Sequence, residues 1–404
     1  MNDSSQPQLP RGAALYLAVV QFFFITTWTV YVAYLPKLLA AAGLPAGYTI
    51  WILMLDQLIF MVMDFVMGMA ADRVGRTLGR LGPLIIAATA ISCVAFLLIP
   101  HAVFLGGAAP AASLALILIW AVTSSALRAP PWVLLSKYAA RSSLPWMNAL
   151  VLSGIAIAGA LAPYIGVTLK NLDPKVPFAL SSLTLFATTA GLVWVERRLA
   201  RRPSMAAQSA PRLGQLIPGM SPFLLACLIL AFGFQIHTAL NSTPQYLRFA
   251  TPDQLQYLLP VFSIGLNIAM FPGAALAKRF GTLPVIAVAA VVGAGGALVS
   301  MQAQSLDILI AGQALAGDAW GCVMMAVFST ATTFGRTGRE GAALGLLFGV
   351  LALATFSRMG AVAAQLNKMP ETAALVAYAP AALWLAGGVM FILLAASRRM
   401  REAA

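Results

Sequence analysis

Long apolar runs repeat along the whole chain, and they constrain the fold more than any other feature. A helix crossing a hydrocarbon core about 30 Å thick needs roughly 20 apolar residues, and runs of that length occur twelve times. They begin at Ala13, Ile50, Leu84, Ala111, Asn148 and Phe178 in the first half, and at Phe223, Gln254, Leu283, Leu306, Gly341 and Thr372 in the second. Only 9% of the 404 residues are charged, against about 25% in soluble domains. The sequence therefore predicts an all-α membrane protein with twelve transmembrane helices, and it excludes a soluble enzyme.

The basic residues gather on one side of the predicted spans, so the net charge of +13 does not indicate a nucleic-acid partner. Of the 25 Lys and Arg residues, 18 lie in the termini and in alternate loops, and 5 lie in the intervening loops. Because cytoplasmic loops are rich in Lys and Arg, both termini are predicted to be cytoplasmic. The polar start, which lacks a signal-peptide pattern, is interpreted as a retained tail. We expect a monomeric, multi-pass protein of a bacterial cytoplasmic membrane, with the lipid bilayer as its partner and no nucleic acid.

The two halves of the chain resemble each other around a polar central segment. The predicted parts are a tail at 1–12, a six-helix bundle at 13–195, a cytoplasmic linker at 196–222, a second six-helix bundle at 223–396 and a tail at 397–404. Arg73-Val74-Gly75 after span two recurs as Arg279-Phe280-Gly281 after span eight, and Leu35-Pro36, ending span one, recurs as Thr243-Pro244. Six spans per half give corresponding helices the same orientation, as in a parallel repeat. The two prolines suggest kinks in spans one and seven.

One segment after span two carries a recognisable motif. Gly68-Met-Ala-Ala-Asp72-Arg73-Val-Gly75-Arg76-Thr-Leu-Gly-Arg80 resembles the signature loop between helices two and three of the major facilitator superfamily. The resemblance covers the whole chain and implies a two-bundle transporter working by alternating access. In that family the loop packs against helix eleven and helps to close the cytoplasmic side, and the glycines that open span eleven suit such contact. The predicted cytoplasmic gate comprises Gly68, Asp72, Arg73, Gly75, Arg76, Gly341 and Gly345.

Two further segments are similar to a narrower family. Asp64-Phe-Val-Met-Gly68 resembles the helix-two segment of the glycoside-pentoside-hexuronide cation symporters, and Arg128-Ala-Pro130-Pro-Trp132 resembles their helix-four segment. In those symporters the position of Arg128 is typically an aspartate that engages sugar or cation. The resemblance therefore implies a coupling role for Asp64, whereas the cation at Arg128 argues against a sodium and sugar site.

Charged residues inside spans cost at least about 2.5 kcal/mol each, so each needs a reason. Asp56 and Asp64 share span two and either bind a coupling ion or hold a gate. Arg128 in span four needs an anion, which is either a carboxylate of the protein or a substrate. Asp318 is midway along span ten, a helix that by resemblance lines the central cavity, so it is a candidate proton carrier that contacts substrate, or else a member of a buried ion pair. Arg358 in span eleven is interpreted as structural.

Uncharged polar residues add to these candidates. In span seven, His237, Asn241 and Gln245 follow each other at four-residue spacing, which places them on one helix face. Polar groups are costly against lipid, so this face should point into the protein. The predicted substrate and coupling residues are Asp318, Arg128, Asp64, Asp56, His237, Asn241, Gln235, Tyr31, Trp28 and Trp320.

These features together favour secondary transport. The sequence has no nucleotide-binding loop and no His/Cys cluster for a metal, so we expect neither an enzyme nor a cofactor. The expected coupling ion is a proton, with sodium as the alternative. The leading prediction is proton-coupled movement of a small polar or anionic organic solute. The alternative is a drug or metabolite proton antiporter, favoured by Met- and Phe-rich spans and by a faint antiporter-like motif from Gly154 to Gly166. A non-transporting receptor or scaffold is a remote third.

Overall fold

The computed structural model describes residues 11–77, 80–136, 141–200, 219–335 and 338–403. Twelve helical segments within them are long and apolar enough to cross a membrane, which confirms the predicted spans. The first six consist of α1 (Arg11–Ala41), α2 (Tyr48–Thr77), α3 (Gly82–Ala102), η1 (Gly106–Ala108) with α4 (Ala109–Ser124), η2 (Ser125–Leu127) and α5 (Ala129–Ser136), then α6 (Leu144–Leu169) after η3 (Arg141–Ser143), and α7 (Lys175–Ala190) with α8 (Leu192–Ala200). The second six consist of α9 (Met220–Gln235) with η4 (Ile236–Asn241) and α10 (Ser242–Tyr246), η5 (Pro252–Gln254) with α11 (Leu255–Leu258) and α12 (Pro260–Phe280), α13 (Thr282–Gln302), α14 (Leu306–Gly335), α15 (Glu340–Ala363) and α16 (Pro370–Ala403).

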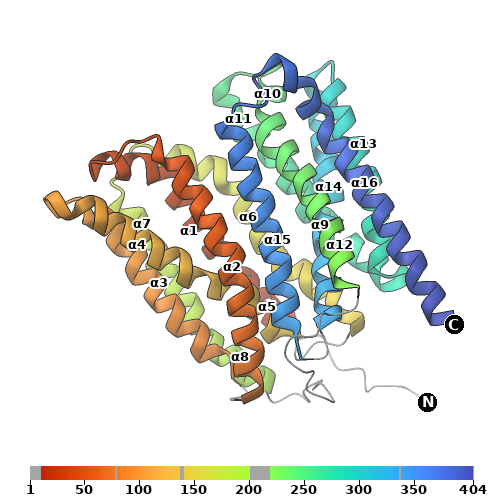
Figure 1. The fold of residues 1–404 in the computed structure, drawn as a ribbon, viewed down its shortest axis with the longest axis horizontal. Coiled ribbons are helices and arrows are strands. Elements are labelled where there is room, and N and C mark those ends of the chain that lie inside the picture. The colour runs from red at the N-terminus through yellow and green to blue at the C-terminus, as the bar shows by residue number, and fades with distance from the viewer. Residues whose placement is uncertain (1–10, 78–79, 137–140, 201–218, 336–337, 404) are drawn as a thin grey trace.

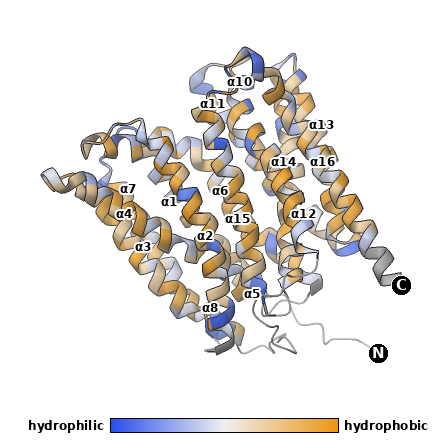
Figure 2. Ribbon diagram, viewed as in Figure 1, coloured by the Kyte–Doolittle hydropathy of each residue, from blue (hydrophilic) through white to orange (hydrophobic). Residues whose placement is uncertain are grey.

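The helices form two bundles, one from each half of the chain, as Figure 1 shows. The bundles meet where α2 packs along α15 and where α6 packs along α12. Large apolar side chains on the outer helices, such as Leu183, Val288 and Leu375, are exposed. The hydropathy colouring of Figure 2 is correspondingly apolar along the helices, with hydrophilic residues mainly near their ends. This surface suits a surrounding bilayer, because lipid chains solvate apolar side chains.

Both ends of the described chain lie on the same side of the bundles, because the number of spans is even. The α2–α3 and α12–α13 connections, which carry the repeated Arg-x-Gly motif, lie on that side too, and Figure 1 shows the ends of α8 and α16 there. We call this side the arginine-rich end. Its cytoplasmic location stays a prediction, as do the domain limits, since residues 201–218 of the predicted linker lie outside the described residues.

Two adjacent prolines interrupt the fourth span just where its charged residue lies. Pro130 and Pro131 have no N–H to donate, so the helix breaks and α5 restarts after Arg128. The carbonyl of Leu127, four residues before Pro131, would lack a helical donor. It accepts a hydrogen bond from Gln21 Nε2 of α1 at 2.7 Å instead. The break therefore fixes Arg128 between two helical pieces and ties it to α1.

The seventh span is also irregular, at the proline that the repeat singles out. Residues 236–241 form a π-helix, a feature that is frequent at functional sites. Pro244 cannot donate to the carbonyl of Leu240, which accepts from Asn367 Nδ2 at 3.3 Å. Pro36 lies inside α1, whose helix continues to Ala41, so the prediction that the first span ends at this proline is wrong by about one turn.

Candidate functional site

Glycines bring α2 and α15 into backbone contact at the arginine-rich end. A Cβ atom on Gly68 would collide with the carbonyl oxygen of Gly341, and one on Gly341 would collide with that of Gly68. Gly345 lies against the backbone of Asp64, and a Cβ there would come within 2.8 Å of Phe65 Cα. The predicted contact of span two with the small residues of span eleven is thus present. Glycine is needed at these positions because any side chain would push the two halves apart.

Asp72 joins the same two helices by hydrogen bonds. Its Oδ1 atom accepts from the N–H of Gly341 at 2.7 Å, and its Oδ2 atom accepts from the N–H of Ala342 at 2.9 Å. These N–H groups belong to the first turn of α15, where a helix has unpaired donors and a partial positive charge. The carboxylate therefore caps a helix of the other half, and it holds the arginine-rich end closed in this structure.

The other predicted gate residues follow Asp72 on α2. Arg73 is exposed. Gly75 has ordinary contact distances and would accommodate a Cβ atom, 3.7 Å from Leu81 Cδ2. The backbone of Arg76 continues α2, and its side chain lies outside the described residues.

Further contacts join the two halves. Asn148 Nδ2 of α6 donates to Ser329 Oγ of α14 at 3.0 Å, and both residues are buried. The Trp132 ring of α5 packs against Phe328 of α14 at 5.1 Å and against Phe348 of α15 at 5.5 Å between ring centroids. Separating the halves at this end would break all of these contacts together with the Asp72 cap.

An ion pair lies about two helical turns from Asp72, inside the membrane-spanning region. Arg128 Nε lies 2.9 Å from Asp64 Oδ2, and the side chains are 17% and 0% exposed respectively. Arg128 was predicted to need an anion, and in this structure the anion is a carboxylate of the protein.

Aromatic rings from both halves hold the guanidinium of Arg128. Its Cζ atom lies 4.9 Å from the Phe60 ring centroid of α2 and 5.1 Å from the Phe348 ring centroid of α15. Such contacts attract the cation through the quadrupole of the ring. Among the described residues, Asp64 is the ion-pair partner of Arg128, reached through Nε, and Nη1 and Nη2 have no hydrogen-bond partner. The pair therefore contacts both halves. It leaves the N–H groups of Nη1 and Nη2, which we call the fork of Arg128, available to another partner.

Asp56 lies two turns further along α2, in a separate aromatic cluster. Tyr31 Oη donates to Asp56 Oδ2 at 2.8 Å, and Asp56 Oδ1 is buried with no hydrogen-bond partner among the described residues. The Tyr31 ring packs against Trp120 at 4.4 Å, and Trp28 packs against both Trp120 and Phe60. Predicted site residues of spans one and two thus meet here, and Phe60 links this cluster to Arg128.

The polar face of span seven forms a hydrogen-bonded chain in the second bundle. His237 Nε2 lies 3.0 Å from Gln313 Oε1, and Gln313 Nε2 donates to Gln245 Oε1 at 2.9 Å. All three side chains are buried. Asn241 points elsewhere and donates to the carbonyl of Val376 at 2.9 Å, because the π-helix changes the angular spacing that an α-helix would give.

Gln235 makes a bond of a different kind, from α9 to α15. Its Nε2 atom donates to Thr355 Oγ1 at 2.8 Å. The side chain is therefore directed to a neighbouring helix of the same half, and it does not join the hydrogen-bonded chain of His237.

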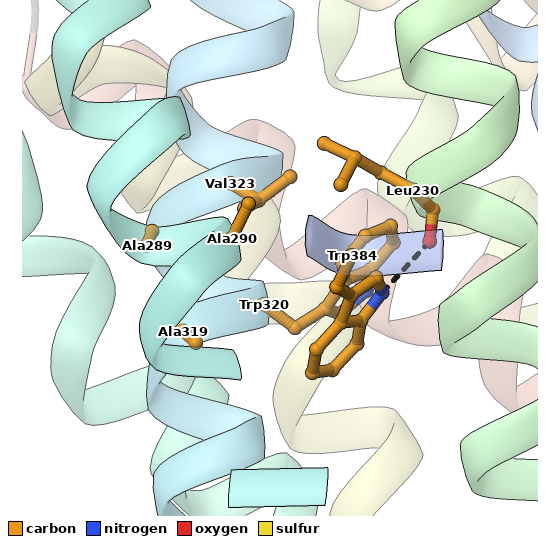
Figure 3. Close-up of a pocket in the computed structure, with 7 residues that line it drawn as sticks. All are labelled: Leu230, Ala289, Ala290, Ala319, Trp320, Val323 and Trp384. Atoms are coloured by element: carbon orange, nitrogen blue, oxygen red, sulfur yellow. Dashed lines mark hydrogen bonds between the residues drawn. The ribbon is translucent and has the colours of Figure 1, made fainter. Parts of the chain in front are cut away.

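Asp318 and Trp320 lie on α14, and the Trp384 ring contacts both Trp320 and His237. Asp318 Oδ1 faces Gly265 of α12, where a Cβ atom would lie 3.1 Å from it, and the side chain is partly exposed. Trp320 stacks between Phe234 and Trp384, with centroids 4.4 Å and 6.1 Å away. Figure 3 shows Trp320 and Trp384 beside apolar residues, with Trp384 Nε1 donating to the carbonyl of Leu230 at 2.9 Å. Trp320 thus packs the second bundle, and the roles predicted for both residues stay predictions.

Comparison with known proteins decides the family. The model of the Major Facilitator Superfamily matches residues 17–357. The chain belongs to the major facilitator superfamily. It is therefore a multi-pass membrane protein with a transporter fold.

Solved structures similar to this superfamily member are themselves transporters. They include the human organic anion transporter MFSD10 (TM-score 0.69, 16% identity, 96% of this chain and 99% of that chain covered). A bacterial homologue of the iron transporter ferroportin in the outward-facing state has a TM-score of 0.74 at 14% identity, with 95% and 99% covered. The E. coli fucose:proton symporter FucP has a TM-score of 0.68 at 14% identity, with 96% and 99% covered. At such identities the similarity establishes the fold. A search of curated protein sequences gave no match.

Sequence reasoning missed three contributors to the sites of this superfamily member. Gln313 connects His237 to Gln245, and a glutamine inside an apolar span was a usable signal. Phe60 and Phe348 flank Arg128, but nothing distinguishes them in the sequence from the many other apolar residues of their spans.

Proposed function

We propose that the protein is a secondary active transporter that moves a small polar or anionic organic solute by alternating access, coupled to protons. The observation that carries the proposal is the ion pair of Asp64 and Arg128, which lies between aromatic rings of the two halves. A buried ion pair that loses one charge by protonation leaves the other without a partner, at a cost of several kcal/mol. Protonation of Asp64 would therefore change the energy of a contact that both halves share.

The coupling step follows from the chemistry of the two side chains. Arg128 keeps its charge, so when Asp64 takes a proton the guanidinium needs another anion. An anionic group of the solute supplies it. Release of the proton restores the pair of Asp64 and Arg128 and expels the solute. Solute and proton are therefore bound together and released together, which is symport.

The conformational step uses the contacts at the arginine-rich end. The Asp72 cap and the bond of Asn148 to Ser329 join the halves there, so an inward-open state requires their rupture. A hydrogen bond to a charged group contributes about 1.5–3 kcal/mol, so loss of both Asp72 bonds is a substantial part of that barrier. In the proposed cycle, Asp64 is protonated and the anionic solute is bound to Arg128, so this site carries no net charge. The stability of that neutral state offsets the cost of breaking the contacts.

The remaining predicted residues have supporting places in this proposal. Asp56, with Tyr31 and Trp28, is a second carboxyl available to a proton. His237 belongs to a polar chain in the opposite half, where a hydroxyl or carbonyl of a solute could exchange hydrogen bonds. Asp318 remains a candidate in span ten. We place the protein in a bacterial cytoplasmic membrane with both termini inside, as a monomer in a lipid bilayer and without a cofactor.

The aromatic cluster beside Asp56 favours the alternative function, which is export of drugs or metabolites. The rings of Trp28, Tyr31, Phe60 and Trp120 pack together, and Tyr31 bonds to the Asp56 carboxyl. Aromatic rings beside a carboxyl are what a site for drug-like cations would use. An antiporter would release protons as its substrate binds, so the sign of the proton movement separates the two functions.

The test uses the full chain in liposomes loaded with a pH-sensitive dye. Monocarboxylates, sugars and cationic drugs are added outside one at a time, and lumenal pH and solute uptake are followed together. Symport predicts that one class enters and acidifies the lumen. Drug-dependent alkalinisation favours the antiporter. Solute uptake that never moves protons would contradict the proposed coupling, and protein-free liposomes provide the baseline.

A further inference from the structure

The structure assigns a substrate class to this site. We propose that it takes aromatic monocarboxylates, with the carboxylate on the free fork of Arg128 and the ring along Trp28. The inference rests on the proposed function and names the substrate that the same site would bind.

The position of the guanidinium carries the first step. Asp64 occupies the Nε side of Arg128, and no hydrogen bond to another described residue uses Nη1 or Nη2. The rings of Phe60 and Phe348 hold the guanidinium at 4.9 Å and 5.1 Å. The guanidinium is planar and the two rings fix its position. Its two parallel N–H groups therefore match the two oxygens of a carboxylate. The side chain is 17% exposed, whereas Asp64 is fully buried, so the guanidinium is the accessible member of the pair.

The charge of the site selects a monoanion. Asp64 and Arg128 together are neutral, so one bound carboxylate gives a net charge of minus one. When Asp64 is protonated, Arg128 and the carboxylate balance each other. A dianion such as a phosphate monoester would leave a net negative charge in both states, and excess charge in a low-dielectric site is costly. A neutral sugar would leave the fork of Arg128 without an anion.

The aromatic part of the substrate follows from what lies next to Arg128. Phe60, which contacts the guanidinium, also packs against Trp28 with centroids 5.6 Å apart. Trp28 is partly exposed, in contrast to the buried rings of Phe60, Tyr31 and Trp120 around it, so Trp28 is the ring that a substrate can reach. A flat ring bound beside Arg128 would find an aromatic surface along these side chains, where stacked and edge-to-face pairs add to the gain from apolar burial.

Proton linkage follows from the closeness of the two anions. A carboxylate on the fork of Arg128 would lie near the Asp64 carboxyl and repel its charged form, so substrate binding should favour protonated Asp64. Arg128 faces this carboxyl from the η2–α5 break. On the α15 side, Gly345 lies against the backbone of Asp64 and Phe348 packs on the guanidinium of Arg128, and both are neutral. Asp56, two turns along α2, bonds to Tyr31 instead. Binding should therefore tighten as the pH falls.

The experiment measures equilibrium binding of radiolabelled benzoate to the purified full-length protein at mildly acid and mildly alkaline pH. Phenyl phosphate, benzylamine, benzamide, acetate and glucose are the competitors. We expect benzoate to be bound more tightly at acid pH, where it is still ionised. Acetate should compete weakly, since it has no ring, and the cationic, neutral and dianionic compounds should not compete.

Variants assign the effect to particular side chains. Arg128→Lys keeps the charge but loses the fork, and should weaken benzoate binding by about tenfold or more. Trp28→Leu should weaken benzoate binding while leaving that of acetate unchanged. Asp64→Asn should bind benzoate at both pH values with the same affinity. Arg358→Gln, which removes the other arginine of a span, is the matched control and should bind as the wild type does.

The outcomes separate this inference from the proposed function. Wild-type benzoate affinity in Arg128→Lys, or competition by benzylamine or benzamide equal to that of benzoate, would overturn the substrate class. If Arg128→Lys does not fold, the comparison of benzoate with acetate in Trp28→Leu decides. Proton-coupled uptake of a sugar without benzoate binding would refute the substrate class and leave the proposed function intact. Benzoate binding without any proton movement in liposomes would support the substrate class and refute the proposed proton coupling.

Discussion

The ion pair between Asp64 and Arg128 predicts a large and non-additive effect on stability. In Arg128→Gln the carboxylate of Asp64, which is 0% exposed, loses its only countercharge among the described residues. Removal of one partner of a buried pair costs about 3–5 kcal/mol. The two ring contacts of the guanidinium are lost as well, for about 0.5–2 kcal/mol each. We therefore expect a loss of about 4–9 kcal/mol in this single variant.

The opposite single variant should be milder. In Asp64→Asn the cation that remains is Arg128, which is 17% exposed and keeps its aromatic neighbours. A partly solvated cation costs less than a fully buried carboxylate, so we expect about 1–3 kcal/mol. The double variant leaves no uncompensated charge. Because replacement of a whole buried pair is often close to neutral, it should be more stable than Arg128→Gln alone.

Thermal unfolding of the four proteins in one detergent at one pH measures this cycle. With an unfolding entropy of about 2.1 cal/mol/K per residue, a protein of this length shifts by about 1 °C for each kcal/mol. Arg128→Gln should then unfold about 4–9 °C below the wild type, with partial recovery in the double variant. If the two single effects simply add in the double variant, the two side chains do not form the pair described, and the argument for coupling fails. Arg358→Gln serves as the control for loss of an arginine from a span.

Four other features give independent predictions. Asp72→Asn weakens the cap on α15, so the arginine-rich end should open more often. A cysteine placed at Asn148 should then react with maleimide roughly tenfold faster or more, since about 1.4 kcal/mol is a factor of ten. Unchanged labelling would argue against the gate. Gln313→Leu leaves His237 without its buried partner and should lower stability by about 1–3 kcal/mol, seen in the same thermal assay, whereas no loss would mean that the chain is not formed. Glu196 accepts from the N–H groups of Leu81 and Gly82 at the start of α3, so Glu196→Ala should destabilise the first half by about 1–3 kcal/mol, and Glu196→Gln by less. A fluorescent reporter fused after the last residue should glow in the bacterial cytoplasm; a periplasmic signal would reverse the predicted orientation.

The fold followed from the sequence because membrane crossing leaves few choices. Each span must satisfy its own backbone and present about 20 apolar residues, so run lengths alone gave all twelve helices. The contact of Gly68 with the glycines of span eleven was also predictable, since small residues mark close packing between helices. Both features depend on local composition, which the sequence displays directly.

The site was less predictable because its geometry arises from helix breaks and from partners far away in the chain. The sequence offered two possible anions for Arg128, and only the position of the break before Pro130 brings it onto Asp64. The predicted face of His237, Asn241 and Gln245 assumed an α-helix, and the π-helix redirects its middle member. Residues that are alike in sequence, such as the phenylalanines of these spans, differ in role only through the helices that face them.

The most direct measurement of the central claim compares net flux with exchange in liposomes that contain Asp64→Asn. A solute that acidifies the lumen with the wild type is chosen from the panel. The account predicts that the variant still exchanges this solute across the membrane, because Arg128 stays free to bind it, but no longer acidifies the lumen or accumulates solute against a gradient. Acidification at the wild-type rate in Asp64→Asn would contradict the account, since the proton would then travel on another residue.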